Sequence, residues 1–159
     1  MAKKKEQSGK NTPRIRNRKA THDYHLIEKL ECGIELTGTE VKSLRAGQGK
    51  IDEAYARIQD GELYLIGANI AHYKQASEGM QHDPTRKRRL LAHKRQIAQL
   101  ESYVRQKGKT IVPLAIYFKN GWAKCEVAVG EGKRSYDKRE DIRKRDMQRD
   151  IKRAMRRRR

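Results

Sequence analysis

The side chains that could catalyse a reaction or hold a metal ion are scattered through this sequence. Its five histidines do not follow the His-Glu-x-x-His spacing of zinc peptidases, and the sequence contains neither a Gly-x-Ser-x-Gly elbow nor a Gly-rich phosphate loop. The carboxylates that a magnesium-dependent nuclease would need are dispersed and would meet only if the fold gathered them: Glu31, Glu35, Glu40, Asp52 and Glu53. We therefore expect no enzyme, no metal site and no cofactor, with such a nuclease as an alternative.

The chemistry that the sequence does support is the binding of phosphate by basic side chains. Its 159 residues include 39 Lys or Arg and 20 Asp or Glu, which gives a formal net charge of +19. The excess is concentrated in residues 1–20, with eight basic and one acidic side chain, and in residues 130–159, with fourteen basic and six acidic. A third block, Arg86–Arg95, has six basic residues and no acid. Charge concentrated in this way attracts polyanions, so the composition predicts a partner that carries phosphate.

The expected compartment follows from the remaining composition. No apolar run approaches the roughly 20 residues of a membrane span, and the basic N-terminus is not followed by the apolar core of a secretion signal. We therefore expect a cytoplasmic protein that binds nucleic acid and no membrane. Cys32 and Cys125 fit neither a zinc ribbon nor a Cys-x-x-Cys redox pair, so we expect both to be reduced and to pack as small apolar side chains.

The chain divides into three segments of different character. Residues 1–18 hold too few apolar side chains to offset the entropy of ordering and are predicted to be a disordered basic arm. Residues 19–131 alternate apolar and polar side chains and are predicted to form the folded, RNA-binding domain. Residues 132–159 form a basic tail whose helical ion pairs are worth only about 0.2–0.5 kcal/mol each. We expect this tail to be coil in solution and to become a helix on its partner.

Two hairpins are predicted from their turn residues. Asp60-Gly61 and Asn120-Gly121 are dipeptides that accept the positive φ angles of a two-residue hairpin turn. Alternating segments flank both turns, and the strands are predicted at residues 54–59, 62–69, 111–119 and 122–129. Pro113 lacks a backbone donor, which predicts an edge or a bulge in its strand.

The other elements complete the predicted fold. A long kinked strand with a short return strand is expected from Asp23 to Leu36, and a short helix from Thr39 to Ala46, which Thr39 can cap. Asp83-Pro84 predicts the start of a long helix over residues 84–107. We predict an α+β protein: a small antiparallel six-stranded β-barrel of the OB-like kind, with one long and one or two short helices and disordered basic N- and C-terminal arms.

Aromatic side chains in a small barrel suit the binding of unstacked bases. Those in or beside the predicted strands are Tyr24, Tyr55, Tyr64, Tyr73, Tyr117, Phe118 and Trp122. Most are expected to pack in the core or hairpins, and Tyr24 is the candidate for an exposed platform because basic and His residues surround it. Structured RNA is favoured over DNA, because no helix-turn-helix or basic-zipper pattern is present.

Five stretches of the sequence, in order, resemble the SsrA-binding protein family, also called small protein B, the partner of bacterial tmRNA. They are Glu40–Gly47 (EVKSLRAG), Asp60–Glu62 (DGE), Gly67–Ile70 (GANI), Asp83–Arg86 (DPTR), and Gly132-Lys133 followed by Asp137–Arg139 (DKR). Each stretch alone is weak, but together they span the body of the chain and are specific.

The resemblance implies a function for the body. It implies an OB-like barrel that binds the tRNA-like domain of tmRNA, supports its aminoacylation and delivers it to stalled ribosomes. Because catalysis then belongs to the ribosome, the protein would act as an adaptor, and we expect a monomer. The positions that resemble the RNA-binding surface of the family are Tyr24, Glu31, Lys42, Arg45, Arg86, Lys124 and Lys133.

The resemblance also implies a role for the tail. The tail would enter the empty mRNA channel near the decoding centre of the 70S ribosome, meet 16S rRNA and fold there as a helix. The positions matched to this engagement are Tyr136, Asp137, Lys138 and Arg139. A ribosomal structural protein would share the basic arms and the barrel, and it remains an alternative that permanent binding to rRNA would reveal.

Overall fold

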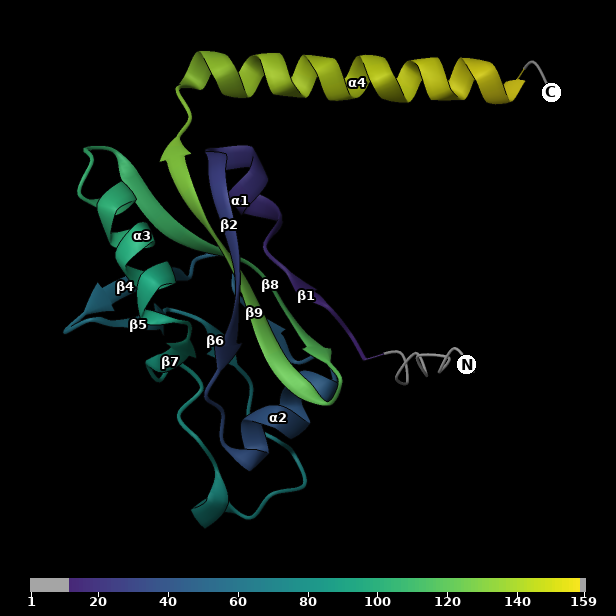
Figure 1. Ribbon diagram of the computed structural model, residues 1–159. Helices are drawn as coiled ribbons and strands as arrows, with labels where there is room; N and C mark the ends of the chain where they lie inside the picture. The colour runs from purple at the N-terminus through teal and green to yellow at the C-terminus, as the bar shows by residue number, and fades with distance from the viewer. Residues whose placement is uncertain (1–11, 158–159) are drawn as a thin grey trace, which may run out of the picture.

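The computed structural model describes residues 12–157, in which strands form most of the body and helices lie at its sides and ends (Figure 1). In chain order the elements are β1 (Ile15–Arg16), α1 (Arg18–Asp23), β2 (Tyr24–Ile34), α2 (Gly38–Arg45), β3 (Gly49–Lys50), β4 (Tyr55–Gln59), β5 (Glu62–Ile66), β6 (Asn69–Ile70), a short 3-10 helix (Glu78–Met80), β7 (Arg88–Leu91), α3 (Lys94–Val104), β8 (Lys109–Lys119), β9 (Trp122–Gly132) and α4 (Ser135–Arg157). Among these residues no helix is both long enough and apolar enough to cross a bilayer.

Six of the described strands pair in a closed antiparallel ring. Their order is β8-β4-β5-β7-β2-β9, and β9 pairs again with β8. The long pairings of β2 with β9 and of β9 with β8 form one wall of the ring. The short strand β1 pairs with β8 in antiparallel orientation. The predicted α+β class is confirmed, and the strands form a large antiparallel sheet, whereas the small OB-like barrel stays a prediction.

The hydrophobic core lies inside this ring. Alternate residues of the strands point inward, and Leu63, Leu65, Ile111 and Val127 are at most 1% exposed. Leu100 of α3 is 2% exposed and joins the same cluster. Burial of each large aliphatic side chain contributes about 1.5–3 kcal/mol, so this cluster is the main support of the ring.

Both predicted hairpins are confirmed. Asp60 and Gly61 have φ angles of 52° and 75°, and Asn120 and Gly121 have φ angles of 52° and 80°. Positive φ at both central residues matches the right-handed twist of the flanking strands. Pro113 is accommodated by a register shift between β8 and β9, which confirms the predicted bulge.

The long helix predicted over residues 84–107 is wrong at its start. The helix α3 begins at Lys94, and residues 88–91 instead form β7, which pairs with both β5 and β2 and completes the ring. Asp83 accepts hydrogen bonds from the N–H and the hydroxyl of Thr85, at 2.9 and 3.0 Å, and so closes a local turn. A side-chain oxygen makes the same bond in such a turn as at a helix start, which is why the Asp-Pro signal was misleading.

The disorder predicted for residues 1–18 is wrong from Ile15 onward. Ile15 and Arg16 pair with β8, and Asn17 is 7% exposed. The amide of Asn17 donates to the carbonyls of Ile51 and Pro113, at 3.1 and 3.0 Å, and caps α1. These bonds order the chain from β1 onward, while residues 1–11 of the predicted arm lie outside the described residues.

Two boundaries near α2 also differ from expectation. No return strand follows Ile34 in the described chain, since Leu36 lies in the loop that leads into α2. The cap residue of α2 is Thr37 rather than Thr39. The carboxylate of Glu40 accepts the backbone N–H of Thr37 at 2.8 Å, so Glu40 suits the positive end of this helix.

The cysteines pack as expected. Cys32 and Cys125 face each other across β2 and β9, and both are buried and unbonded. Burial raises the pKa of Cys32 to about 11 and raises that of Cys125 as well. Both thiols are therefore protonated and unreactive at neutral pH.

The basic tail is a helix in this structure. α4 spans 23 residues and extends sideways from the end of β9 (Figure 1, green to yellow). This differs from the coil expected for the free chain, and the physical reason lies in contacts of its first turns with α1 and β2, described below. The predicted conversion from coil to helix on the ribosome stays a prediction.

Candidate nucleic-acid interface

Glu31 is held on the outer face of the sheet by residues of β8. Its carboxylate accepts a hydrogen bond from the hydroxyl of Tyr117 and forms an ion pair with Lys119 at 3.2 Å. These bonds, from Tyr117 first and then Lys119, lower the pKa of Glu31, so the group is a carboxylate at neutral pH. A carboxylate held in this way can accept a hydrogen bond from the amino group of a base.

The pairing of Tyr117 with Glu31 makes a testable prediction. Burial and then the hydrogen bond to Glu31 raise the pKa of Tyr117 to about 12. The neutral hydroxyl therefore stabilises the fold below pH about 10, and this contribution is lost as the pH rises through about 12. Ultraviolet absorbance at pH about 11 reports deprotonation of tyrosine, and the difference from Tyr117→Phe isolates the signal of Tyr117. Tyr117 should stay protonated in the native chain and deprotonate partly in the variant Glu31→Gln. Equal deprotonation in the two proteins would show that Glu31 has no influence on Tyr117.

Cations lie around this carboxylate, and an exposed aromatic side chain lies at the turn of the same hairpin. The guanidinium of Arg14 lies 4.4 Å from the ring centroid of Tyr117 and pairs with Glu126 at 2.7 Å. Lys124 is half-buried and lies opposite Tyr117 in the strand register. Trp122, at the hairpin turn, is 74% exposed. An exposed indole next to cations is a surface on which a base can stack while its phosphates are neutralised.

The helix α2 adds two exposed cations near the same hairpin. Figure 1 shows α2 beside the turn between β8 and β9. Arg45 lies 5.4 Å from the ring of Phe118 in β8, and Lys42 lies 5.4 Å from the ring of Tyr73. Within residues 12–157 neither cation has a carboxylate at ion-pair distance, so both charges are available to phosphate.

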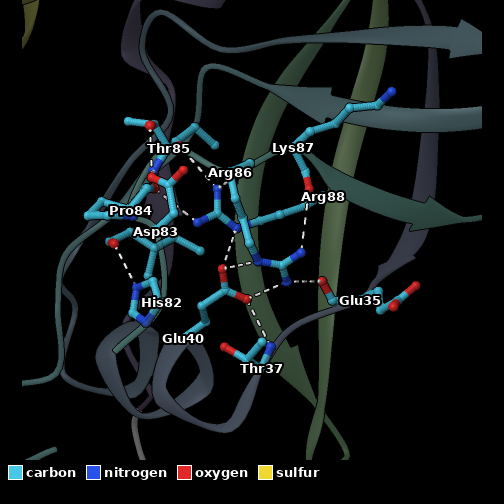
Figure 2. A network of polar contacts seen from close by, with 12 residues as sticks. Glu35, Thr37, Glu40, His82, Asp83, Pro84, Thr85, Arg86, Lys87 and Arg88 are labelled. Carbon is cyan, nitrogen blue, oxygen red and sulfur yellow. Dashed lines mark hydrogen bonds and ion pairs between the residues drawn. The ribbon is translucent and has the colours of Figure 1, made fainter. Parts of the chain in front are cut away.

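A buried ionic network fixes α2 to the body (Figure 2). Arg86 donates to both carboxylate oxygens of Glu40, each at 2.7 Å, and Arg88 donates to one of them at 2.9 Å. The side chains of Glu40 and Arg88 are 0% exposed. Burial alone would raise the pKa of Glu40. Hydrogen bonds from Arg86 and from the N–H of Thr37, together with the charge of Arg88, outweigh this effect, so the pKa of Glu40 is lowered. Glu40 is therefore ionised between two guanidinium groups.

Arg88 makes three further hydrogen bonds to backbone carbonyls. They reach the carbonyls of Ala68, Pro84 and Arg86 at 2.9, 3.0 and 3.0 Å. A buried charge is tolerated only when it is paired and hydrogen-bonded in this way. Arg86 forms a bidentate pair with Glu40 and so supports the position of α2. Its predicted contact with RNA stays a prediction.

The last two predicted body residues lie at the base of the tail. Tyr24 is half-buried against Gly130, where an added Cβ would come within 2.9 Å of the Cβ of Tyr24. Lys133, whose side chain is 8% exposed, donates to the carbonyl of Thr21 at 2.9 Å and pairs with Asp141. Lys133 thus holds the tail, whereas Tyr24 packs against β9.

The predicted residues therefore do not form one cluster. Glu31 and Lys124 share the outer face of the sheet, and Arg45 and Lys42 lie on α2, whereas Tyr24 and Lys133 lie at the other end of β2 and β9. Sequence reasoning missed three residues near Glu31: its partners Tyr117 and Lys119, and Arg14 on the ring of Tyr117. Their proximity to Glu31 depends on strand register, which the sequence does not give. We define a candidate surface for RNA, called the RNA face, as Glu31, Lys42, Arg45, Tyr117, Lys119, Trp122 and Lys124. Within the described residues, no group of three or more His, Cys, Asp or Glu is placed to hold a metal ion.

Comparison with known proteins gives one consistent result. Residues 14–157 match the family model described as "SmpB protein". The SsrA-binding protein of Thermobifida fusca is 47% identical over 161 residues, which cover 100% of both chains. The SsrA-binding protein of Chloroflexus aggregans is 51% identical over 142 residues, or 89% of this chain and 90% of that one. A solved chain from "tmRNA-SmpB: a journey to the center of the bacterial ribosome" superposes with a TM-score of 0.67 at 47% identity, and covers 82% of this chain and 95% of that chain.

Proposed function

Because the chain belongs to the SmpB family of SsrA-binding proteins, we propose that it binds tmRNA and acts with it on the ribosome in trans-translation. The observation that carries this proposal is the identity of 47% along the full length of an SsrA-binding protein. The RNA face agrees with it, since it has an exposed indole and, within residues 12–157, three cations without an ion-pair partner, Lys42, Arg45 and Lys124. Such groups suit a folded RNA.

We further propose that the ring of strands is an OB-like barrel and that its RNA face binds the tRNA-like domain of tmRNA. Lys42, Arg45 and Lys124 would neutralise phosphates, and Glu31 would accept a hydrogen bond from a base or order a neighbouring cation. Binding there would support aminoacylation of tmRNA and its delivery to stalled ribosomes. The protein itself would act as an adaptor in the cytoplasm and catalyse no reaction.

The tail is proposed to act on the ribosome. Its charge and shape would replace the missing pairing of codon and anticodon, with α4 in the empty mRNA channel near the decoding centre and 16S rRNA. As a helix, α4 is about 34 Å long, enough to extend well beyond the body. Tyr136 is 68% exposed and Arg139 is also exposed, so both can contact rRNA.

Binding measurements across a salt series test the role of the RNA face. Arg45→Ala and Lys124→Ala should each weaken tmRNA binding and reduce the slope of log affinity against log salt by about 0.7–0.9, because each loses one phosphate contact. Arg57→Ala is the matched control: Arg57 is exposed on β4, opposite β2 in the order of the ring. If Arg57→Ala lowers the slope as much, binding depends on overall charge and the proposed face is wrong.

A further inference from the structure

The tail helix is joined to the body by a short connection and by several polar contacts. β9 ends at Gly132 and α4 begins at Ser135, so only Lys133 and Arg134 separate them. The backbone N–H of Lys133 donates to the carbonyl of Asp23 at 2.8 Å, which continues the pairing of β2 with β9 by one more bond. The direction of α4 is therefore determined within a few residues of the sheet.

Lys133 ties the first turns of α4 to α1. Its ammonium group lies between the carbonyl of Thr21 and the carboxylate of Asp141. Because Asp141 lies about two turns into the helix, this contact restrains rotation of α4 about its connection as well as its position. The hydrogen bond from Lys133 lowers the pKa of Asp141, as expected for a formed pair.

Two residues of the DKR stretch also contact the body. The ammonium of Lys138 lies 3.2 Å from a carboxylate oxygen of Asp23, at the end of α1. Asp137 lies 3.6 Å from the imidazole of His25 in β2, and it also accepts the backbone N–H of Arg134 at 3.3 Å. The hydrogen bond from His22 and then that from Lys138 lower the pKa of Asp23.

The third residue of the stretch behaves differently. Arg139 is exposed and has no carboxylate at ion-pair distance among residues 12–157, and Tyr136 is 68% exposed. Around the start of α4, side chains thus divide into those that face the body, Asp137 and Lys138, and those that face solvent, Tyr136 and Arg139. This division matters because α4 is long, so a rotation of about 10° at its base moves its far end by about 6 Å.

We propose that Asp23 and His25 position the tail by pairing with Lys138 and Asp137, which together with Lys133 and Asp141 set the direction of α4. This inference rests on the proposed function of the tail and reassigns Asp137 and Lys138 from contacts with rRNA to positioning residues. Ion pairs of this exposure are individually weak, so the contacts bias the direction of the helix and permit it to adjust on binding.

A charge exchange between Asp23 and Lys138 tests the proposal. The single variants Asp23→Lys and Lys138→Asp place like charges opposite each other, and the double variant restores an opposite pair. In a reconstituted translation system with a non-stop message, each single variant should tag stalled peptides about two- to fivefold more slowly. The double variant should recover most of that loss. Asp60→Lys, which makes the same charge change at a distant hairpin turn, should leave tagging unchanged.

A distance measurement on the protein alone separates positioning from contact with the ribosome. Spin labels at Lys94→Cys on α3 and Gln148→Cys on α4 report the body-to-tail distance, while the buried thiols of Cys32 and Cys125 stay unlabelled. The single variants should broaden the distance distribution and the double variant should narrow it again. Arg139→Ala should slow tagging without changing the distribution.

The outcomes that overturn the proposal are distinct from failure of the proposed function. If Asp23→Lys tags normally, or if the double variant is no better than the worse single variant, Lys138 acts through the ribosome and the positioning role is wrong. The same holds if the distance distribution is identical in all variants. If the unmodified protein itself supports no tagging, the proposed function fails, and the distance data still decide whether the contacts orient α4.

Discussion

Replacing Glu40 with alanine is expected to lower the free energy of unfolding by about 3–5 kcal/mol. Glu40 and Arg88 are both fully buried, and removal of the carboxylate leaves the guanidinium of Arg88 desolvated without a counter-charge. Arg86 would lose both of its bonds to Glu40 as well. Urea unfolding followed by far-ultraviolet circular dichroism measures the change.

A neighbouring carboxylate supplies the control for this prediction. Glu35 is exposed, and only its backbone carbonyl accepts a bond from Arg86, at 3.2 Å. Glu35→Ala should therefore change the stability by no more than about 0.5 kcal/mol. A loss below about 1 kcal/mol for Glu40→Ala would show that the network does not hold α2 to the body.

The same network makes a prediction about pH. Because the folded-state pKa of Glu40 is lowered, its stabilisation is present above the unfolded value of about 4.3 and is lost as the pH falls through the lower folded value. Glu40→Gln cannot titrate at this position. The free energy of unfolding of the Glu40→Gln variant should therefore fall less steeply with decreasing pH than that of the native chain, as measured by the same urea unfolding.

Removing residues 135–159 is expected to separate the two proposed activities. The RNA face and the strand β9 remain intact, so affinity for tmRNA should stay within about threefold at moderate salt, the change reflecting lost tail charge. Tagging on stalled ribosomes should fall to background, because nothing then fills the mRNA channel. Gel-shift binding and tagging in a reconstituted system measure the two effects.

A variant with an unchanged tail composition shows whether tagging depends on the charge of the tail or on the order of its residues. A full-length chain in which residues 135–157 are scrambled keeps the charge but loses the order of Tyr136, Asp137 and Arg139. It should bind tmRNA like the native chain and still fail to support tagging. A truncated protein that loses most of its tmRNA affinity, or one that still tags, would contradict the division between body and tail.

Features with local causes were predictable from the sequence. The turns at Asp60-Gly61 and Asn120-Gly121 and the bulge at Pro113 each depend on the conformational limits of one or two residues, and all were predicted correctly. The α+β class followed from the same alternating segments. The family resemblance, rather than composition, selected Glu31 and Lys124 among many charged residues.

Features that depend on distant partners were not predictable in this way. Arg88 lies in a basic block that predicted contact with phosphate, and its burial depends on Glu40, which is 48 residues away. Likewise the hydroxyl of Tyr117 meets Glu31 across 86 residues, and Asp23 meets Lys138 only because α1 ends beside the base of α4. Charge patterns along a chain do not reveal which cations are neutralised by the fold and which remain free for RNA.

The central claim is that this chain recognises tmRNA specifically, and a competition assay tests it most directly. The full-length protein is equilibrated with labelled tmRNA, and unlabelled tmRNA, a canonical tRNA or 16S rRNA fragments are added over a series of salt concentrations. We predict that only tmRNA competes effectively and that this preference persists at moderate salt, where non-specific phosphate binding is weak. Equal competition by all three RNAs would contradict the claim and favour a general RNA-binding or ribosomal protein.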